Sequence, residues 1–340
     1  MDSLPMIRYL IAGQIRREYV VSPRGLAKSD FPGGNILYSA AGLSLWDGPV
    51  GLISKIGNDF PKDDLQVIQS HGFDIKGIQI SDSPLDLRLF KGYADNTNQA
   101  NNNNPVSYYA ALQIEFPKSL LGYSNDYDEI INQPGKITPY TISINQVPEF
   151  YWEASAIHIC PIDYQSHQFL MSAVRQAHIN HVTVDISSQI LSPIYWDEVP
   201  GMIEGASALI TTDDKLLNLF QGRSKDLWEI AEILAMHDCP LVVIKRGMEG
   251  QYIYDHHSKK RWAVPAYPSS SADPTGAGDS YNGGFLAGLR TTYDPVESAL
   301  QGNISASLTV EGIGPFFALD SLPGLAKARL ENLRSMVRSL

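Results

Sequence analysis

A glycine turn that runs into an apolar helical segment, with one carboxylate at the junction, is the part of this chain best suited to chemistry. Residues 273–286 read Asp-Pro-Thr-Gly-Ala-Gly-Asp-Ser-Tyr-Asn-Gly-Gly-Phe-Leu, and Asp279 is that carboxylate. Glycines let backbone amides approach an anion closely, and the first N–H groups of a helix lack partners within it. These N–H groups and the helix dipole predict a phosphate site at Gly276, Ala277 and Gly278. Because an acid is electrostatically unfavourable there, we expect Asp279 to accept a proton from a hydroxyl that attacks a phosphoryl group.

Asp279 taken alone would more often be an ordinary acid at a helix start. The glycines before it and the small residues Gly283, Gly284 and Gly288 after it favour the catalytic interpretation. The helix dipole should favour its ionised form. With an ordinary pKa of about 3.9, it would take the proton late, as the new phosphorus–oxygen bond forms.

Composition limits the classes of protein and partner. The 340 residues carry a net charge of −11 and contain no dense Lys/Arg run, so nucleic acid and anionic membranes are not expected as partners. No apolar run reaches membrane-spanning length, and Met1–Pro5 shows no basic region before an apolar core. Cys160 and Cys239 make no disulfide framework, and a buried thiol is the favoured interpretation of Cys160. We expect a cytoplasmic protein in which residues 1–340 form one domain.

Short β-branched runs alternate with longer segments of helical spacing. This alternation predicts an α/β fold, a three-layer α/β/α doubly wound and mostly parallel sheet, with ligands outside the carboxyl ends of its strands. The expected strands are Ile7–Ala12, Val50–Ile56, Ala156–Cys160, His181–Ile186, Ala208–Thr211 and Leu241–Lys245. The expected helices are Asn35–Trp46, Asp63–His71, Ser166–His178, Asp214–Phe220 and Ser224–Met236, followed by three from Gly278 onward, the last over Leu322–Leu340.

Residues of about 14–33 and 84–116 break this alternation. Gln14–Val21 is predicted to continue the first strand with alternating charge, and Leu87–Tyr93 and Val106–Ile114 are predicted to be exposed antiparallel strands. Half-polar alternation suits a small sheet that projects from the body. We expect this sheet to form a lid over the substrate.

The segment Asn96–Asn104, dominated by Asn and Gln, has two interpretations. It is either a floppy connection or the edge of the lid. Open strand edges invite pairing, so a homodimer through the lid is a further expectation.

The fourteen-residue stretch matches, position by position, the C-terminal motif of the ribokinase-like (PfkB) carbohydrate kinase family. The resemblance spans about residues 7–315 and is weakest in the lid. It implies an ATP-dependent kinase that phosphorylates a hydroxyl of a sugar or sugar-like small molecule. Asp279 would be the catalytic base, the amides of residues 276–278 the anion hole, and ATP with Mg²⁺ the cofactors.

The resemblance also implies binding residues. Pro32-Gly33-Gly34-Asn35 and the following helix resemble the family's sugar-binding signature, and residues 242–252 resemble its nucleotide-side loop. The implied substrate-binding residues are Glu18, Gly33, Gly34, Asn35 and Tyr38. The implied nucleotide-binding residues are Thr212, Lys245, Gly247, Gly250, Thr275 and Asn303.

The chain departs from the family on the acceptor side. Glu18 stands where an aspartate is usual, Arg16 where a small polar residue is common, and Tyr38 where an asparagine is expected. These changes leave open which acceptor binds.

A second departure concerns metal binding. Thr212-Asp213-Asp214-Lys215 aligns with an Asn-x-x-Glu motif that organises magnesium-bound water, and a lysine cannot hold such water in the same way. Asp213 and Asp214 are the residues expected to compensate. Asp273 and Thr275 match a site that holds K⁺ in many members.

Other functions remain open. A nucleoside or polyol could replace the sugar. A non-catalytic nucleotide- or metabolite-binding protein on the same fold is the alternative from another class, motivated by Arg16, Tyr38 and Lys215. A vitamin-precursor kinase or a nucleotide-repair dehydratase is a third alternative, although such relatives usually lack the Gly33–Gly34 signature.

Overall fold

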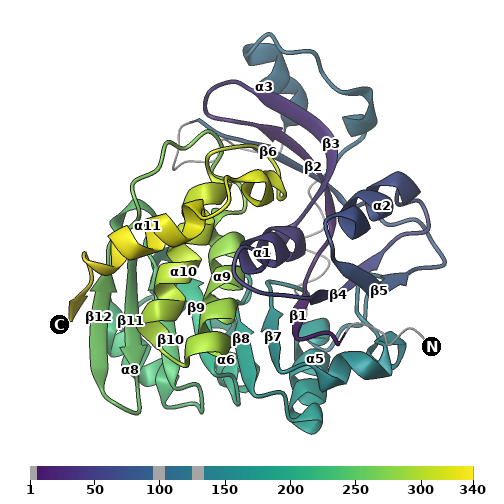
Figure 1. Cartoon of the computed structure of the whole chain (residues 1–340). Coiled ribbons are helices and arrows are strands. Elements are labelled where there is room, and N and C mark those ends of the chain that lie inside the picture. The colour runs from purple at the N-terminus through teal and green to yellow at the C-terminus, as the bar shows by residue number, and fades with distance from the viewer. Residues whose placement is uncertain (1–5, 95–103, 125–133, 340) are drawn as a thin grey trace.

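The structure, a computed structural model, describes residues 6–94, 104–124 and 134–339. A ten-stranded sheet in the order β13-β12-β11-β10-β9-β8-β7-β1-β4-β5 forms its centre (Figure 1). Its strands are β1 (Tyr9–Ala12), β4 (Val50–Ile56), β5 (Asp74–Ile80), β7 (Ala156–Ile159), β8 (His181–Val184), β9 (Ala208–Thr212), β10 (Leu241–Lys245), β11 (Gln251–Asp255), β12 (Lys260–Val264) and β13 (Arg338–Ser339).

The strands from β10 to β5 in that order are parallel, and those from β10 to β13 are antiparallel. The parallel strands include every strand expected from the sequence, so the predicted doubly wound, mostly parallel sheet is confirmed.

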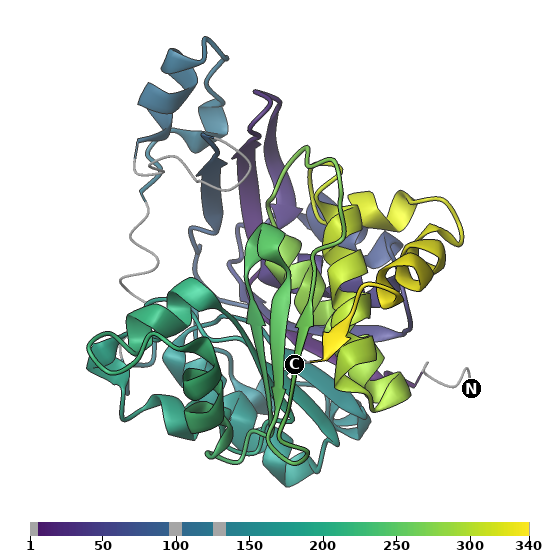
Figure 2. The ribbon, with the colours of Figure 1, turned by 90° about the vertical axis from the view of Figure 1, so that its left-hand side faces the viewer.

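Helices cover both faces of the sheet, which is seen nearly edge-on in Figure 2. Buried side chains alternate between the faces: Val242 of β10 belongs to the core beneath one helix layer, and Val243 to the core beneath the other. The helices are α1 (Asn35–Ser44), α2 (Lys62–Ser70), α3 (Pro105–Ala111), α5 (Tyr164–Ala177), α6 (Val199–Ile203), α7 (Asp213–Leu219), α8 (Leu227–Ala235), α9 (Ala277–Thr292), α10 (Pro295–Thr309) and α11 (Leu325–Arg334). Three helices follow Gly276 as expected, but α11 ends early and the chain closes in β13.

A second sheet, which we call the small sheet, projects above the body (Figures 1 and 2). It has the order β3-β2-β6 and consists of β2 (Arg16–Val21), β3 (Ala27–Gly33) and β6 (Arg88–Gly92). The expected projecting sheet therefore exists, but the expectation of antiparallel strands is wrong for β6, which pairs with β2 in parallel.

The expected strand over Val106–Ile114 is also wrong, because this segment forms α3. The Asn104 side chain accepts a hydrogen bond from the Ser107 N–H, and Pro105 occupies the first turn. Both are helix-start signals that outweigh the aromatic and β-branched content. Tyr109 packs into the core of the small sheet. All but the last residue of Asn96–Asn104 lies outside the described residues.

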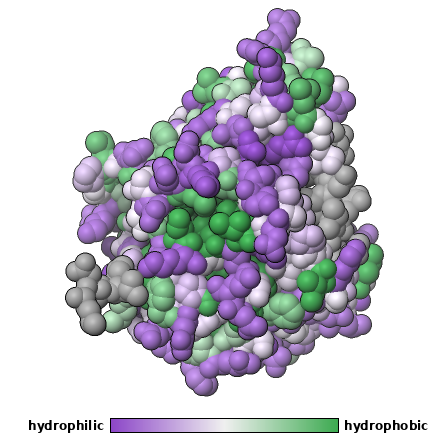
Figure 3. All heavy atoms as spheres, turned by 90° about the vertical axis from the view of Figure 1, so that its right-hand side faces the viewer, coloured by the Kyte–Doolittle hydropathy of each residue, from purple (hydrophilic) through white to green (hydrophobic). Residues whose placement is uncertain are grey.

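Over the part of the chain that the structure describes, no helix is long and apolar enough to cross a membrane. Cys160 and Cys239 are buried free thiols, as expected for Cys160. The face on the right of Figure 1 is mainly hydrophilic around one apolar area near its middle (Figure 3).

Helices α1 and α9 pack backbone against backbone. A Cβ added at Gly283 of α9 would lie 1.8 Å from the carbonyl oxygen of Ser39, and one added at Gly42 of α1 would lie 2.2 Å from that of Ser280. Only glycine permits this approach, which brings the start of α1 beside the start of α9.

We expect Gly283→Ala to destabilise the fold by about 1–3 kcal/mol or more, because the added methyl group meets backbone that cannot move alone. Gly201→Ala is the matched control, since Gly201 is an exposed helical glycine whose Cβ would meet nothing within 4 Å. It should be neutral or stabilising by up to about 1 kcal/mol. Urea unfolding of both variants measures the difference, and equal stabilities would contradict the packing argument.

Candidate active site

The Gly276–Gly278 turn begins α9 beside the carboxyl ends of the parallel strands. Gly276 has φ 73°, in the left-handed region, and no side chain caps the helix. A Cβ at Gly276 would lie 2.1 Å from Cδ1 of the Tyr38 ring, which packs on the turn. The Ala277 N–H donates to the Pro274 carbonyl at 3.3 Å. The neighbouring N–H groups of this first turn are the ones left to meet an anion.

The Asp279 carboxylate lies in the first turn of α9 and is partly exposed. Among the described residues, none donates a hydrogen bond or forms an ion pair to it. Burial raises its pKa above the usual value, although Lys91 and Lys245 act to lower it. Burial thus opposes the ionised form that the helix dipole is expected to favour, and a raised pKa makes a carboxylate a stronger proton acceptor.

The residues expected to bind the acceptor surround a buried carboxylate. Glu18 of β2 is fully buried and accepts hydrogen bonds from the Gly34 N–H at 3.0 Å and the Tyr38 hydroxyl at 2.9 Å. A Cβ at Gly33 would lie 2.4–2.7 Å from Glu18 side-chain atoms. The Nζ of Lys91, a residue that the sequence reasoning missed, lies 3.9 Å from Glu18 Oε1.

Asn35 serves the scaffold. Its Oδ1 accepts from the Gln14 N–H at 2.8 Å, and its Nδ2 donates to the Pro161 carbonyl at 2.6 Å. Both ends of the side chain are thus engaged in joining the ends of β1 and β7.

The expected nucleotide-side residues divide into two groups. Lys245, at the end of β10, reaches the α9 turn and donates to the Gly278 carbonyl at 3.2 Å. Gly247 and Gly250 lie in the tight hairpin between β10 and β11, both with positive φ. Asn303 is farther inside, where its amide donates to the Pro265 carbonyl and its Oδ1 accepts from the Tyr267 N–H.

A cluster that the sequence reasoning missed joins the ends of β8, β9 and β10. The buried Asp185 follows β8, and Lys215 of α7 and Lys245 approach its two carboxylate oxygens at 2.7 and 3.3 Å. Asn282 of α9 donates to Asp185 Oδ2 and accepts from Lys245. Burial acts to raise the pKa of Asp185, but the two lysines outweigh it and hold that pKa below its usual range. The feature of the sequence that could have pointed to this cluster is the carboxylate of Asp185 directly after a strand.

The residues expected to organise Mg²⁺ are engaged elsewhere. The Thr212 hydroxyl donates to Asp214, and Asp213 accepts from the Asp214 N–H and pairs with Arg246 at 3.7 Å. Lys215 occupies the place of an acid. Within the described ranges, no three acids, histidines or cysteines group as a metal centre. Lys215 is a donor and cannot hold magnesium-bound water, whose partners must be oxygen acceptors, and within this set Asp213 and Asp214 carry the carboxylate oxygens. Their part in a magnesium network stays a prediction.

Asp273 and Thr275 fit a cation better. The Thr275 N–H and hydroxyl both donate to Asp273 Oδ1, at 3.0 and 2.7 Å. Asp273 Oδ2 is buried and has no hydrogen-bond partner among the residues that the structure describes, and burial raises the pKa of this acid. A bare buried carboxylate oxygen is a suitable ligand for a monovalent cation.

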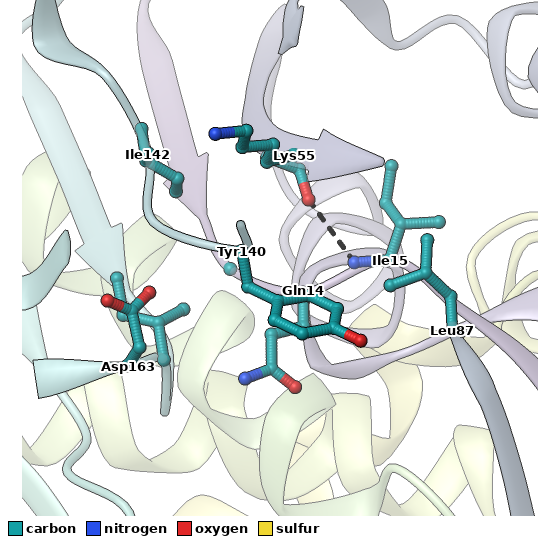
Figure 4. A pocket seen from close by; sticks show the side chains of 10 residues that line it. Gln14, Ile15, Lys55, Leu87, Tyr140, Ile142 and Asp163 are labelled. Atoms are coloured by element: carbon teal, nitrogen blue, oxygen red, sulfur yellow. Dashed lines mark hydrogen bonds between the residues drawn. The ribbon is translucent and has the colours of Figure 1, made fainter. Parts of the chain in front are cut away.

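A small pocket lies at the same end of the sheet, next to Gly13 at the end of β1 (Figure 4). Gln14, Tyr140, Asp163 and Lys55 contribute polar groups to its lining. The Ile15 N–H donates to Ser54 Oγ along one wall. Asp163 serves the fold here, because its Oδ1 caps α5 by accepting from the Ser166 N–H at 2.9 Å and also accepts from the Thr141 hydroxyl at 3.1 Å.

Comparisons with known proteins agree with this geometry. The family described as "pfkB family carbohydrate kinase" matches residues 121–321, more than half of the chain. A protein named cytidine kinase, from Thermococcus kodakarensis, is 27% identical over 290 residues, which covers 83% of this chain and 88% of that protein. The structure of a Burkholderia thailandensis nucleoside kinase with inosine matches with TM-score 0.69 and 18% identity, covering 96% and 98% of the two chains. An E. coli ribokinase II candidate solved with ATP and Mg²⁺ matches with TM-score 0.69 and 18% identity, covering 96% and 99%.

The raised pKa of Asp279 has a consequence for folding. The folded protein binds this proton more tightly than the unfolded chain does, so the fold loses stability as the pH rises through the folded pKa. Asp279→Asn should therefore melt at a higher temperature than the wild type at about pH 8, and the gain should disappear towards about pH 4.

Thermal unfolding across that range measures the effect. Asp63→Asn is the matched control, because Asp63 is an exposed acid in the first turn of α2. It should show no such gain. A lower melting temperature for Asp279→Asn at neutral pH would mean that the carboxylate makes a stabilising contact.

Proposed function

The chain belongs to the pfkB family of carbohydrate kinases, and on that premise we propose that it transfers the terminal phosphoryl group of ATP to a hydroxyl of a small sugar-like acceptor. The observation that carries this proposal is the partly exposed Asp279 carboxylate, without a described donor and with a raised pKa, beside the uncapped start of α9.

The proposed reaction needs little covalent chemistry from the protein. The acceptor oxygen forms a bond to the terminal phosphorus as the bond from that phosphorus to ADP breaks, and the hydroxyl proton passes to Asp279. The amides of residues 276–278 stabilise charge on the transferred group. Mg²⁺ would bind together with ATP, coordinated by its phosphates as is common, and would neutralise part of their negative charge.

We favour a nucleoside as the acceptor. The cytidine kinase of Thermococcus kodakarensis matches 83% of this chain, which supports a related acceptor. Glu18 and Lys91 would then face the sugar hydroxyls.

Residues 14–33 and 84–116 are proposed to act as a lid. Contacts between the small sheet and the far half of the chain support this: Arg24 donates to Ser270 Oγ at 3.0 Å, and the Tyr93 hydroxyl lies 2.9 Å from Thr275 Oγ1. Pairing of two copies through the lid stays a prediction, which the sedimentation mass of the protein in solution would test.

The proposal is tested with Mg·ATP and a panel of nucleosides, free sugars and polyols, with ADP release as the readout. We expect nucleosides to give the highest kcat/KM. Asp279→Asn should lower kcat by about 10²–10⁴, the usual contribution of a positioned acid–base group, and leave ATP affinity unchanged.

Asp63→Asn should keep wild-type turnover and serves again as the control. Near wild-type turnover of Asp279→Asn would exclude Asp279 as the base. ATP binding without ADP release for any acceptor would favour the non-catalytic binding protein.

We also propose that K⁺ binds at Asp273 and raises turnover. Replacing K⁺ by tetramethylammonium should lower the kcat of the wild type, because the buried Oδ2 would lose its counter-charge. Asp273→Asn keeps the shape and removes the charge, so its activity should no longer depend on K⁺. Titration of KCl at constant ionic strength measures this, and a wild type indifferent to K⁺ would refute the proposal.

A further inference from the structure

Two lysines share one buried carboxylate beside the proposed phosphate site. Lys215 Nζ donates to Asp185 Oδ1 at 2.7 Å, and Lys245 Nζ lies 3.3 Å from Asp185 Oδ2. The side chains are 4% exposed for Asp185, 15% for Lys215 and 10% for Lys245. Asp185 alone is in ion-pair contact with both lysines, and the other acid whose charge they influence is Asp279 at the proposed phosphate site. Buried charges are costly unless they are matched.

The two lysines differ in the donors that they have left. Lys245 uses all three N–H groups on Asp185, the Gly278 carbonyl and Asn282 Oδ1. Lys215 donates to Asp185 and to the Ile186 carbonyl at 2.9 Å. An ammonium group has three donors, so among the described residues one N–H of Lys215 has no acceptor.

The place of Lys215 in the fold is unfavourable for a purely structural lysine. It lies in the first turn of α7, where the helix dipole favours acids such as the preceding Asp213 and Asp214. Its side chain reaches back across the strand ends to the side of the sheet where α9 begins, and it contributes to lowering the pKa of Asp279 against burial. A positively charged side chain held at a helix start, where the helix dipole disfavours it, is suited to binding an anion.

We propose that Lys215 binds the β- and γ-phosphate oxygens of the nucleotide, with Asp185 as the positioning residue that holds Lys215 and Lys245 side by side. This inference rests on the proposed function for the presence of ATP. In the resembled family, a glutamate at this position organises magnesium-bound water. Here the lysine neutralises phosphate charge directly, and nucleotide binding depends less on Mg²⁺.

The test measures binding without any acceptor. Calorimetry gives the Kd values of adenosine, AMP and ATP for the wild type, Lys215→Met and Lys215→Glu, each with EDTA and with Mg²⁺. Without Mg²⁺, Lys215→Met should weaken ATP about 10- to 100-fold, the range for a charge-assisted hydrogen bond. Adenosine and AMP should change less than about 2-fold.

Lys215→Glu should bind ATP weakly in EDTA and regain affinity with Mg²⁺ to a greater extent than the wild type does. Lys62→Met is the matched control, because Lys62 is an exposed lysine in the first turn of α2. It should leave every Kd unchanged.

A structural role would give a different pattern. Equal weakening of adenosine and ATP by Lys215→Met would assign Lys215 to the fold, and no weakening of either would make it an incidental ion pair. Both results overturn the inference. If Lys215→Met does not fold, a second experiment uses Lys215→Arg as the variant and inorganic tripolyphosphate as the ligand. Tripolyphosphate should raise the melting temperature of both the wild type and Lys215→Arg. No stabilisation of either would overturn the inference.

The two proposals fail separately. A wild type that binds no nucleotide contradicts the proposed function itself. A wild type that binds ATP, with an ATP Kd that is the same in Lys215→Met, contradicts only the role of Lys215.

Discussion

The close approach of α1 and α9 is the constraint on which the site depends. Glycines on both helices allow a separation at which a Cβ at Gly283 would lie 1.8 Å from a backbone oxygen of α1. Because α1 follows the Gly33–Gly34 turn and α9 follows the Gly276–Gly278 turn, this contact brings two distant glycine turns together. The Tyr38 ring then packs directly on Gly276 and joins the two glycine turns.

The acids near the contact between α1 and α9 differ in whether their charges are compensated. Glu18 and Asp185 are buried with donors or counter-charges. Asp279 lacks a described donor, and Asp273 retains one bare oxygen. Burial raises the pKa of both of these acids, so each costs stability when it is ionised. Acids with pKa values perturbed in this way are found more often at binding and catalytic sites than elsewhere.

The departures from the family motif also form a pattern. Tyr38 closes the acceptor side with a hydrogen bond to Glu18, and Lys215 pairs with Asp185 at the strand ends. Each side chain therefore completes a buried polar pair. Replacing one partner of such a pair would leave a buried polar group or charge unpaired, which costs free energy of folding.

The sequence by itself determined the parallel strands of the described sheet other than β5, the helices α1, α2, α5, α7 and α8, and the glycine turn with Asp279. These features arise from local periodicity, from glycine and from residue order, which one chain displays directly. The strand predicted over residues 106–114 was wrong. Asn104 caps a helix there and Pro105 occupies its first turn, and these two signals outweigh the strand-like composition of the segment.

Only the tertiary structure decided that β6 is parallel to β2, that Lys91 faces Glu18, and that Lys215 meets Asp185 from 30 residues away. It also decided the raised pKa of Asp279. The strand pairing, the charge contacts and the pKa depend on burial and on the distances between groups on different elements. Neither burial nor those distances can be read from a short stretch of sequence.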